Sequence, residues 1–155
     1  MSDLAQPVHP PGAPPRIAYC LAVDDVDHRT DLAVANGARV VVAPFDAGDQ
    51  GRVATLIAPV GAVLSLWRPR GFAGWPVSAT AEGTPRHAVL ACEGPEWARD
   101  FYTRTTGTPL GRAAFGEAGP AAAGTGAGPA AGSVPQWEPA LAVDDPDAVI
   151  RRDPP

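Results

Sequence analysis

The sequence lacks several features that mark particular classes of protein. It has no lysine, only two cysteines, and no apolar run of the ~20 residues that a membrane-spanning helix needs. Cys20 and Cys92 are too few for a disulfide framework and do not have the spacing of a metal site. Seventeen acidic residues against twelve arginines give a net charge of −5, which argues against a nucleic-acid-binding surface.

The N-terminal residues also lack a leader pattern. Residues 1–14 are rich in proline and have no basic region followed by an apolar core, so we predict a disordered tail and not a signal peptide. We therefore expect a cytoplasmic protein with no membrane partner and no nucleic-acid partner. A chain of 155 residues with 45% apolar residues is long enough to bury a sizeable core.

The most complete pattern covers residues 15–70. An apolar run, Ile17 to Val23, predicts a buried strand, and a helix is expected from about Val26 to Asn36, with Gly37 as its left-handed cap. Three further apolar runs separated by turn residues then predict strands over 39–44, 52–58 and 62–67. The pattern predicts one complete module in the order strand, helix, strand, strand, strand.

Three acidic residues, Asp24, Asp25 and Asp27, lie where the first strand ends and the helix begins. Carboxylates at this position cap the free N–H groups of a helix and favour its positive end. A cluster of carboxylates is also a possible metal site. The sequence favours the acidic helix start and leaves the metal alternative open.

A second, partial module is predicted over residues 86–115, after a linker at 71–85. It has a strand over 86–92 and a helix that opens at Pro95, where Trp97 and Phe101 are four residues apart and are both expected in the core. At most one short strand is predicted over 110–115. Residues 116–134 are rich in Gly, Ala and Pro and predict a flexible linker.

A repeated motif follows this linker. The sequence LAVDDVD at residues 21–27 recurs as LAVDDPD at residues 141–147. Residues 135–155 are therefore predicted to be a fragment of a further module, which begins with a strand and a helix start and then stops. A repeated unit indicates that each copy needs a partner to bury its sheet face.

The motif, the Gly-Arg before the third predicted strand and the Pro-x-Gly turn before the fourth together resemble the glyoxalase/bleomycin-resistance/dioxygenase superfamily, also called vicinal oxygen chelate. The chain is similar to tandem glyoxalase-like proteins of actinobacteria, and its incomplete modules predict a truncated member of that group. The resemblance implies an α+β fold of βαβββ modules, one complete over 15–70 and one incomplete over 85–115, with a mixed cupped sheet and helices on its outer face.

The resemblance also implies where a metal would bind. Metal-using members supply a His from the first strand and a Glu from the last strand of each module, which would suit Fe, Mn, Ni or Zn. Those positions fall on Ala18 and Ser65 in the first module, on His87 in the second and on Glu138 in the fragment. His87 and Glu138 are the candidate ligands, and His87 could equally be a pocket-wall residue. With so few ligands, the resemblance implies a degenerate metal site and no required cofactor.

Strand alternation extends the candidate site from these positions. Residues that share a strand face with them should line the cup, because alternate side chains point the same way. The predicted ligand-binding pocket contains Cys20, Val63, Ser65, Trp67, His87 and Val89. Trp67 could stack on a flat ligand, or it could be an ordinary core residue.

Three functions compete on this evidence. The first is a small-molecule binder with a degenerate metal site, similar to drug-sequestering members of the superfamily. The second is a metal-dependent lyase, isomerase or ring-cleaving dioxygenase, so whether the protein is an enzyme stays open. The third is a module that works only as a homodimer or within a larger tandem protein. No nucleophile–His–acid set, phosphate loop or dinucleotide fingerprint is present.

Overall fold

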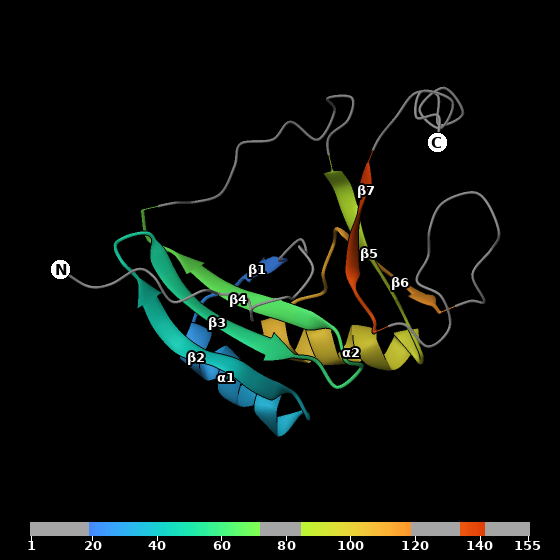
Figure 1. Ribbon diagram of the computed structural model, residues 1–155, viewed down its shortest axis with the longest axis horizontal. Helices are drawn as coiled ribbons and strands as arrows, with labels where there is room; N and C mark the ends of the chain where they lie inside the picture. The colour runs from blue at the N-terminus through green and yellow to red at the C-terminus, as the bar shows by residue number, and fades with distance from the viewer. Residues whose placement is uncertain (1–18, 72–84, 119–133, 142–155) are drawn as a thin grey trace, which may run out of the picture.

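The computed structural model describes residues 19–71, 85–118 and 134–141. The predicted N-terminal tail, Ala18, most of both predicted linkers and the rest of the C-terminal fragment lie outside the described residues. Two sheets and two helices make up the described part of the chain (Figure 1). In chain order these elements are β1 (Cys20–Ala22), α1 (Val26–Ala35), β2 (Arg39–Ala47), β3 (Gly51–Ile57), β4 (Val63–Pro69), β5 (Pro85–Cys92), α2 (Pro95–Thr106), β6 (Ala113–Glu117) and β7 (Trp137–Leu141).

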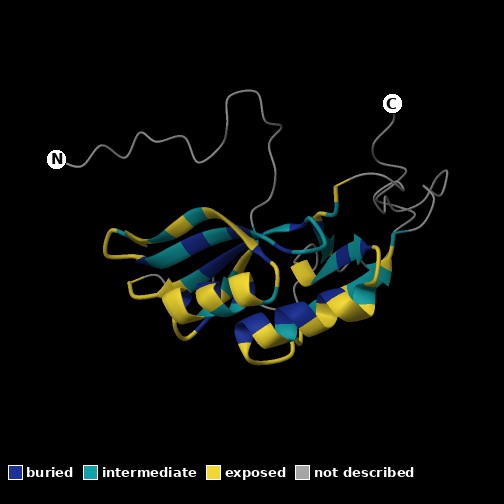
Figure 2. Cartoon of the chain, turned by 90° about the horizontal axis from the view of Figure 1, so that it is seen from below, coloured by how far each residue is buried: buried dark blue, intermediate teal, exposed yellow. Residues whose placement is uncertain are grey.

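The first module has the predicted order of elements. Its four strands form one sheet, sheet A, in the order β1-β4-β3-β2. β1 pairs with β4 in parallel, whereas β2, β3 and β4 are antiparallel neighbours, so the sheet is mixed. The two helices lie on one side of the two sheets (Figure 2). The predicted α+β class with mixed cupped sheets and outer helices is confirmed.

The acidic residues at the start of α1 all have structural partners. Asp25 is the N-cap, and its carboxylate accepts a hydrogen bond from the backbone N–H of His28 at 3.0 Å. Asp24 accepts two hydrogen bonds from Arg29, at 2.8 and 2.9 Å, which hold the pKa of Asp24 well below its usual range. Asp27 is likewise bound by Arg52. The helix-start interpretation is correct for this cluster.

Arg29 also connects the first module to the second. Gly107 ends α2 in a left-handed conformation, with φ of 80°. A Cβ atom at Gly107 would lie 2.6 Å from Nη2 of Arg29, so the guanidinium packs in the space that a side chain would fill. The carboxylate of Asp24 thus orients an arginine that packs against the end of the neighbouring helix.

The second sheet, sheet B, joins the partial module to the C-terminal segment. Its strand order is β6-β5-β7, with β6 parallel and β7 antiparallel to β5. β6 continues to Glu117, so the prediction of a linker from residue 116 is wrong at its first two residues. β7 comes from the segment predicted to be a further module, and it pairs with the second.

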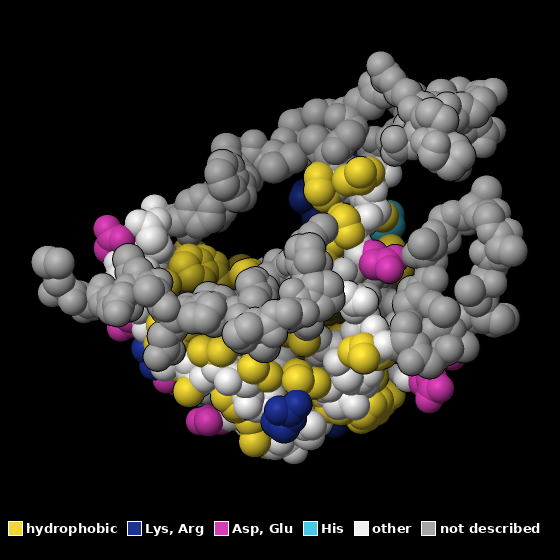
Figure 3. All heavy atoms as spheres, viewed as in Figure 1, with side chains coloured by type: hydrophobic (Ala, Val, Ile, Leu, Met, Phe, Trp, Pro, Cys, Tyr) yellow, Lys and Arg dark blue, Asp and Glu magenta, His cyan; other side chains and the backbone are white. Residues whose placement is uncertain are grey.

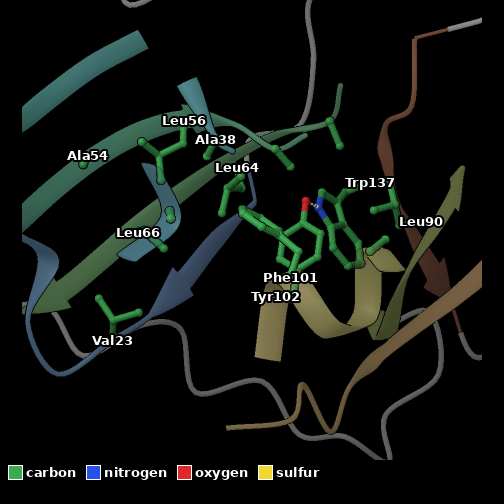
Figure 4. Close-up of a cluster of buried hydrophobic side chains, with 14 of the residues drawn as sticks. Val23, Ala38, Ala54, Leu56, Leu64, Leu66, Leu90, Phe101, Tyr102 and Trp137 are labelled. Carbon is green, nitrogen blue, oxygen red and sulfur yellow. Dashed lines mark hydrogen bonds between the residues drawn. The ribbon is translucent and has the colours of Figure 1, made fainter. Parts of the chain in front are cut away.

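One hydrophobic core runs under both sheets (Figure 4). In sheet A the side chains of Leu56, Leu64 and Leu66 face α1 and are fully buried. In α2 the buried residues are spaced by three or four positions, as one face of a helix requires. They are Ala98, Phe101, Tyr102, Thr105 and Thr106.

The predicted core position of Trp97 is wrong, because 53% of its surface is exposed. It precedes the first buried residue of α2, Ala98, and so lies just outside the buried stripe although it is four residues from Phe101. It borders a small cleft beside Asn36, at the end of α1. The four-residue spacing correctly predicts that Trp97 and Phe101 lie on the same side of the helix. It does not determine how deeply each side chain is buried.

Candidate functional site

The face of sheet A opposite α1 carries the first candidate site, and we call it the cup face. Strand pairing places its side chains in cross-strand rows, because directly opposed residues point to the same face. The first row runs across all four strands from Ala22 through Trp67 and Val53 to Phe45. Phe45 is 46% exposed and Trp67 is half-buried, so the row presents aromatic surface at the sheet face.

The second row is more polar. It runs from Cys20 through Ser65 and Thr55 to Val42. The hydroxyl oxygens of Thr55 and Ser65 are 3.0 Å apart, within hydrogen-bonding distance. Each hydroxyl can donate one bond and accept others, so the pair keeps capacity to bind a polar group of a ligand. Val63 belongs to a third row, opposite Ile57.

Trp67 is positioned by a glycine on the neighbouring strand. A Cβ atom at Gly51 would lie 2.6 Å from Cζ2 and 2.7 Å from Cη2 of the Trp67 ring. Real atoms do not approach so closely, so the indole occupies the space above Gly51 that a side chain would take. The ring is therefore held against the sheet at the end of the cup face where β3 begins.

Cys20 is the exposed thiol of the second row. Partial burial raises the pKa of the thiol above its usual value, because the apolar surroundings disfavour the thiolate. A thiol with a raised pKa is a weaker nucleophile at neutral pH. Cys20 is therefore suited to line a pocket and poorly suited to attack a substrate.

The candidate metal ligands lie on sheet B. Val89 is directly opposite Glu138, and His87 is two residues along β5 from Val89, so all three side chains share one face. His87 is exposed and Glu138 is half-buried. Within residues 19–71, 85–118 and 134–141, no three or more His, Cys, Asp or Glu side chains gather in a way that could hold a metal ion.

The donor set does not fit a catalytic metal ion. Such a site normally has three protein ligands and an open position, whereas sheet B offers two donors. In sheet A the position of the expected Glu is Ser65, and a neutral hydroxyl is a poor metal ligand. The described residues therefore do not supply the donors of a catalytic metal ion.

The structure separates the predicted site residues into two groups. Cys20, Val63, Ser65 and Trp67 share the cup face of sheet A, whereas His87, Val89 and Glu138 share a face of sheet B. Sequence reasoning missed the cup-face residues contributed by β2 and β3, although period-two alternation along β3 could have indicated those of that strand. The missed residues are Val42, Phe45, Val53, Thr55 and Ile57.

The described residues form an α+β protein with an apolar sheet face and two candidate metal donors on a second sheet. No protein-family model matches the chain. Two curated proteins, both named "Putative glyoxylase CFP32", from Mycobacterium bovis and Mycobacterium tuberculosis, are 34% identical to it over 94% of its length. This similarity confirms the resemblance to the glyoxalase/vicinal oxygen chelate superfamily that the sequence indicates.

The chain spans 59% of the length of these two relatives. Among the helices of the described residues, none is long and apolar enough to cross a membrane.

Proposed function

We propose that the protein binds a small, flat organic molecule on the cup face of sheet A without a metal ion, in the manner of a bleomycin-resistance-like binder in the cytoplasm. The observation that carries this proposal is the aromatic row of Trp67 and Phe45 beside the hydroxyl pair of Thr55 and Ser65. Apolar walls with a few placed polar groups are the usual composition of a small-molecule site.

The expected binding mode follows from the two rows. A flat ring would lie over Val53 between the two aromatic side chains, where stacking and edge contacts favour it. A carbonyl, hydroxyl or amide on the ring would reach the adjacent hydroxyl pair. The ligand would therefore be selected by its shape and by one neutral polar substituent.

A thermal-shift screen with flat aromatic drugs, bleomycin among them, tests this proposal. A ligand that binds only the folded protein stabilises it by RT ln(1 + [L]/Kd), so the melting temperature rises with the logarithm of ligand concentration. For a hit, Trp67→Ala should weaken binding about tenfold, equivalent to about 1.4 kcal/mol. The matched control is Trp97→Ala, which removes an exposed indole from α2 and should leave the affinity unchanged. Equal affinity in the Trp67 variant and the native protein would contradict the proposal.

The second candidate is a metal-dependent lyase, isomerase or ring-cleaving dioxygenase of the same superfamily. The shared sheet face of His87 and Glu138 favours it, because these two donors would bind a metal ion together with a third ligand from elsewhere. Elemental analysis of protein purified without chelator is the test. About one Fe, Mn, Ni or Zn ion per chain, lost in His87→Ala and kept in His28→Ala, would support a metal enzyme. Metal-free native protein would count against it.

The third proposal concerns assembly. In the described residues no helix covers the cup face, and hydrophobic side chains gather on the surface turned to the viewer in Figure 3. We expect a homodimer in which a second copy covers the cup face. In a longer tandem protein, another module of the same chain would cover it. Analytical ultracentrifugation distinguishes these, and a stable monomer at micromolar concentration would contradict the homodimer.

A further inference from the structure

One edge of sheet B lacks the features that protect the other sheet edges of the described residues. This edge is β6, which pairs with β5 on one side only (Figure 1). By contrast, β1 has only three residues, β2 has two register shifts and Pro44, and β7 has Pro139 at a position whose backbone groups turn away from β5. β6 has five residues in unbroken register, with no proline, lysine or arginine. Such an edge can pair with a further strand.

A comparison of the two modules explains why this edge is open. In sheet A, β4 pairs in parallel with the first strand of its module, and β3 and β2 extend the sheet beyond β4. In sheet B, β6 has the corresponding place, in parallel with β5. Only residues 107–112 lie between α2 and β6, which is too few for two strands of ordinary length. The edge that β3 covers in the first module therefore has no covering strand in the described part of the second.

The backbone groups that β6 turns outward are arranged symmetrically. The carbonyl of Arg112 accepts a hydrogen bond from β5 at 2.9 Å, and the N–H of Ala118 donates one to β5 at 3.2 Å. Because backbone groups alternate in direction along a strand, the even-numbered residues between these two also turn toward β5. The residues whose backbone groups turn away are Ala113, Phe115 and Glu117, with Phe115 at the centre.

We propose that the β6 edge binds a second copy of this chain through the same strand, antiparallel, with a two-fold axis at Phe115. Phe115 then pairs with Phe115 of the second copy, and Ala113 pairs with Glu117 at each end. Every outward N–H of the three residues meets a carbonyl, and sheet B continues from one copy into the other. The interface is a sheet edge and not the cup face, so it does not rest on the proposed function.

The side chains on the helix side of β6 favour this antiparallel arrangement. The ring of Phe115 packs against Tyr102, and the guanidinium of Arg99 lies 5.7 Å from the centroid of the Phe115 ring. In the antiparallel pair, Glu117 of the second copy lies diagonally across from Phe115 on the same face, where the long side chain of Arg99 can reach it. A parallel pair would instead place the two Glu117 carboxylates side by side. Charge complementarity therefore selects the antiparallel pair.

The present partner of Arg99 does not prevent this contact. Arg99 pairs with Glu96 one helical turn away, and the side chain of Glu96 is 81% exposed. An ion pair that is this exposed contributes little to stability, so the guanidinium is available to a second carboxylate. A single pair of short strands buries much less surface than a permanent dimer does. We therefore expect an association that depends strongly on protein concentration.

Hydrogen exchange of the full chain, read at single residues by mass spectrometry, tests the pairing directly. The N–H groups of Phe115 and Glu117 should exchange about tenfold more slowly at high protein concentration than at low concentration, because only the paired edge protects them. Ala114 and Gly116 provide the control within the same strand. Their N–H groups turn toward β5, so their exchange should be the same at both concentrations.

A charge exchange between two variants tests the contact of Arg99 with Glu117. Arg99→Glu and Glu117→Arg each place like charges together at both ends of the interface, so each alone should dimerise about tenfold more weakly in analytical ultracentrifugation. An equal mixture of the two variants restores opposite charges and should dimerise as the native protein does. The matched controls, Arg104→Glu on the same helix and Glu93→Arg before it, should leave the dimerisation constant unchanged.

Several results would overturn the proposal. One is exchange at Phe115 and Glu117 that does not change with concentration, whether it is fast or, in a monomer whose own chain covers the edge, slow. Another is a mixture of the charge variants that associates no better than either variant alone. Phe45→Glu places a charge on the cup face and should leave the pairing of β6 intact. A dimer that is lost in Phe45→Glu and retained in Glu117→Arg would belong to the cup face and would refute the β6 interface.

Discussion

Replacing Tyr102 with Phe tests how the C-terminal segment is held to the second module. The side chain of Tyr102 is fully buried, and its hydroxyl oxygen accepts a hydrogen bond from Nε1 of Trp137 at 3.1 Å (Figure 4). The two rings also meet edge to face, with centroids 5.1 Å apart. Tyr102→Phe keeps the ring and removes the acceptor, so the buried indole N–H loses its partner.

The expected cost follows from this loss. A buried donor without a partner costs about 1–3 kcal/mol of the free energy of unfolding, and removal of one oxygen atom leaves almost no cavity. Tyr19 provides the matched control, because its ring also lies near Trp137 while its buried hydroxyl has no hydrogen-bond partner in the described part of the chain. Tyr19→Phe should therefore leave stability unchanged or raise it.

Urea denaturation followed by circular dichroism measures both variants. A double-mutant cycle of Tyr102→Phe with Trp137→Phe should show a coupling of about 1 kcal/mol, because each change alone breaks the same hydrogen bond. Equal costs for the Tyr102 and Tyr19 variants, or additive costs in the cycle to within about 0.3 kcal/mol, would refute this account of the contact.

Three further predictions follow from other contacts. Gly51→Ala places a Cβ atom 2.6 Å from the Trp67 ring and 2.5 Å from the carbonyl oxygen of Arg68, so unfolding free energy should fall by about 1–3 kcal/mol and the Trp67 indole signal in NMR should move. Asp25→Ala removes the N-cap of α1 and should cost about 1 kcal/mol in the same urea assay. Iodoacetamide should label the exposed Cys20 and not the buried Cys92 in native protein, as counted by mass spectrometry. Because the pKa of Cys20 is raised, its labelling at pH 8 should be slower than that of a free cysteine and should still be accelerating above pH 9.

Much of the fold could be predicted because its signals are local. The helix start at Asp25, the end of α1 just before the left-handed Gly37 and the turns between strands depend on residues that are neighbours in the sequence. The pairing of β7 with β5 could not be predicted in this way, because it joins residues far apart in the chain. The burial of Trp97 was misjudged for a related reason, since it depends on how α2 is rotated against the sheets.

The candidate site was predicted only where the resemblance supplied a position. Ser65 and Trp67 follow from the last-strand ligand position, and Cys20 follows from the first strand. Thr55 and Phe45 lie on strands for which no position was carried over, and the bulges in β2 disturb the alternation that would have revealed Phe45. The separation of His87 from Ser65 on different sheets could not be read from strand patterns, which say nothing of how sheets are joined.

The irregular course of β2 has a consequence for solubility. β2 is the outer strand of sheet A, and a straight outer strand would offer its backbone groups to another molecule and promote polymerisation. Its two register shifts, together with Pro44, which has no N–H to donate, interrupt that row of groups. The protein can therefore display an apolar sheet surface without being drawn into edge-to-edge fibrils along this strand.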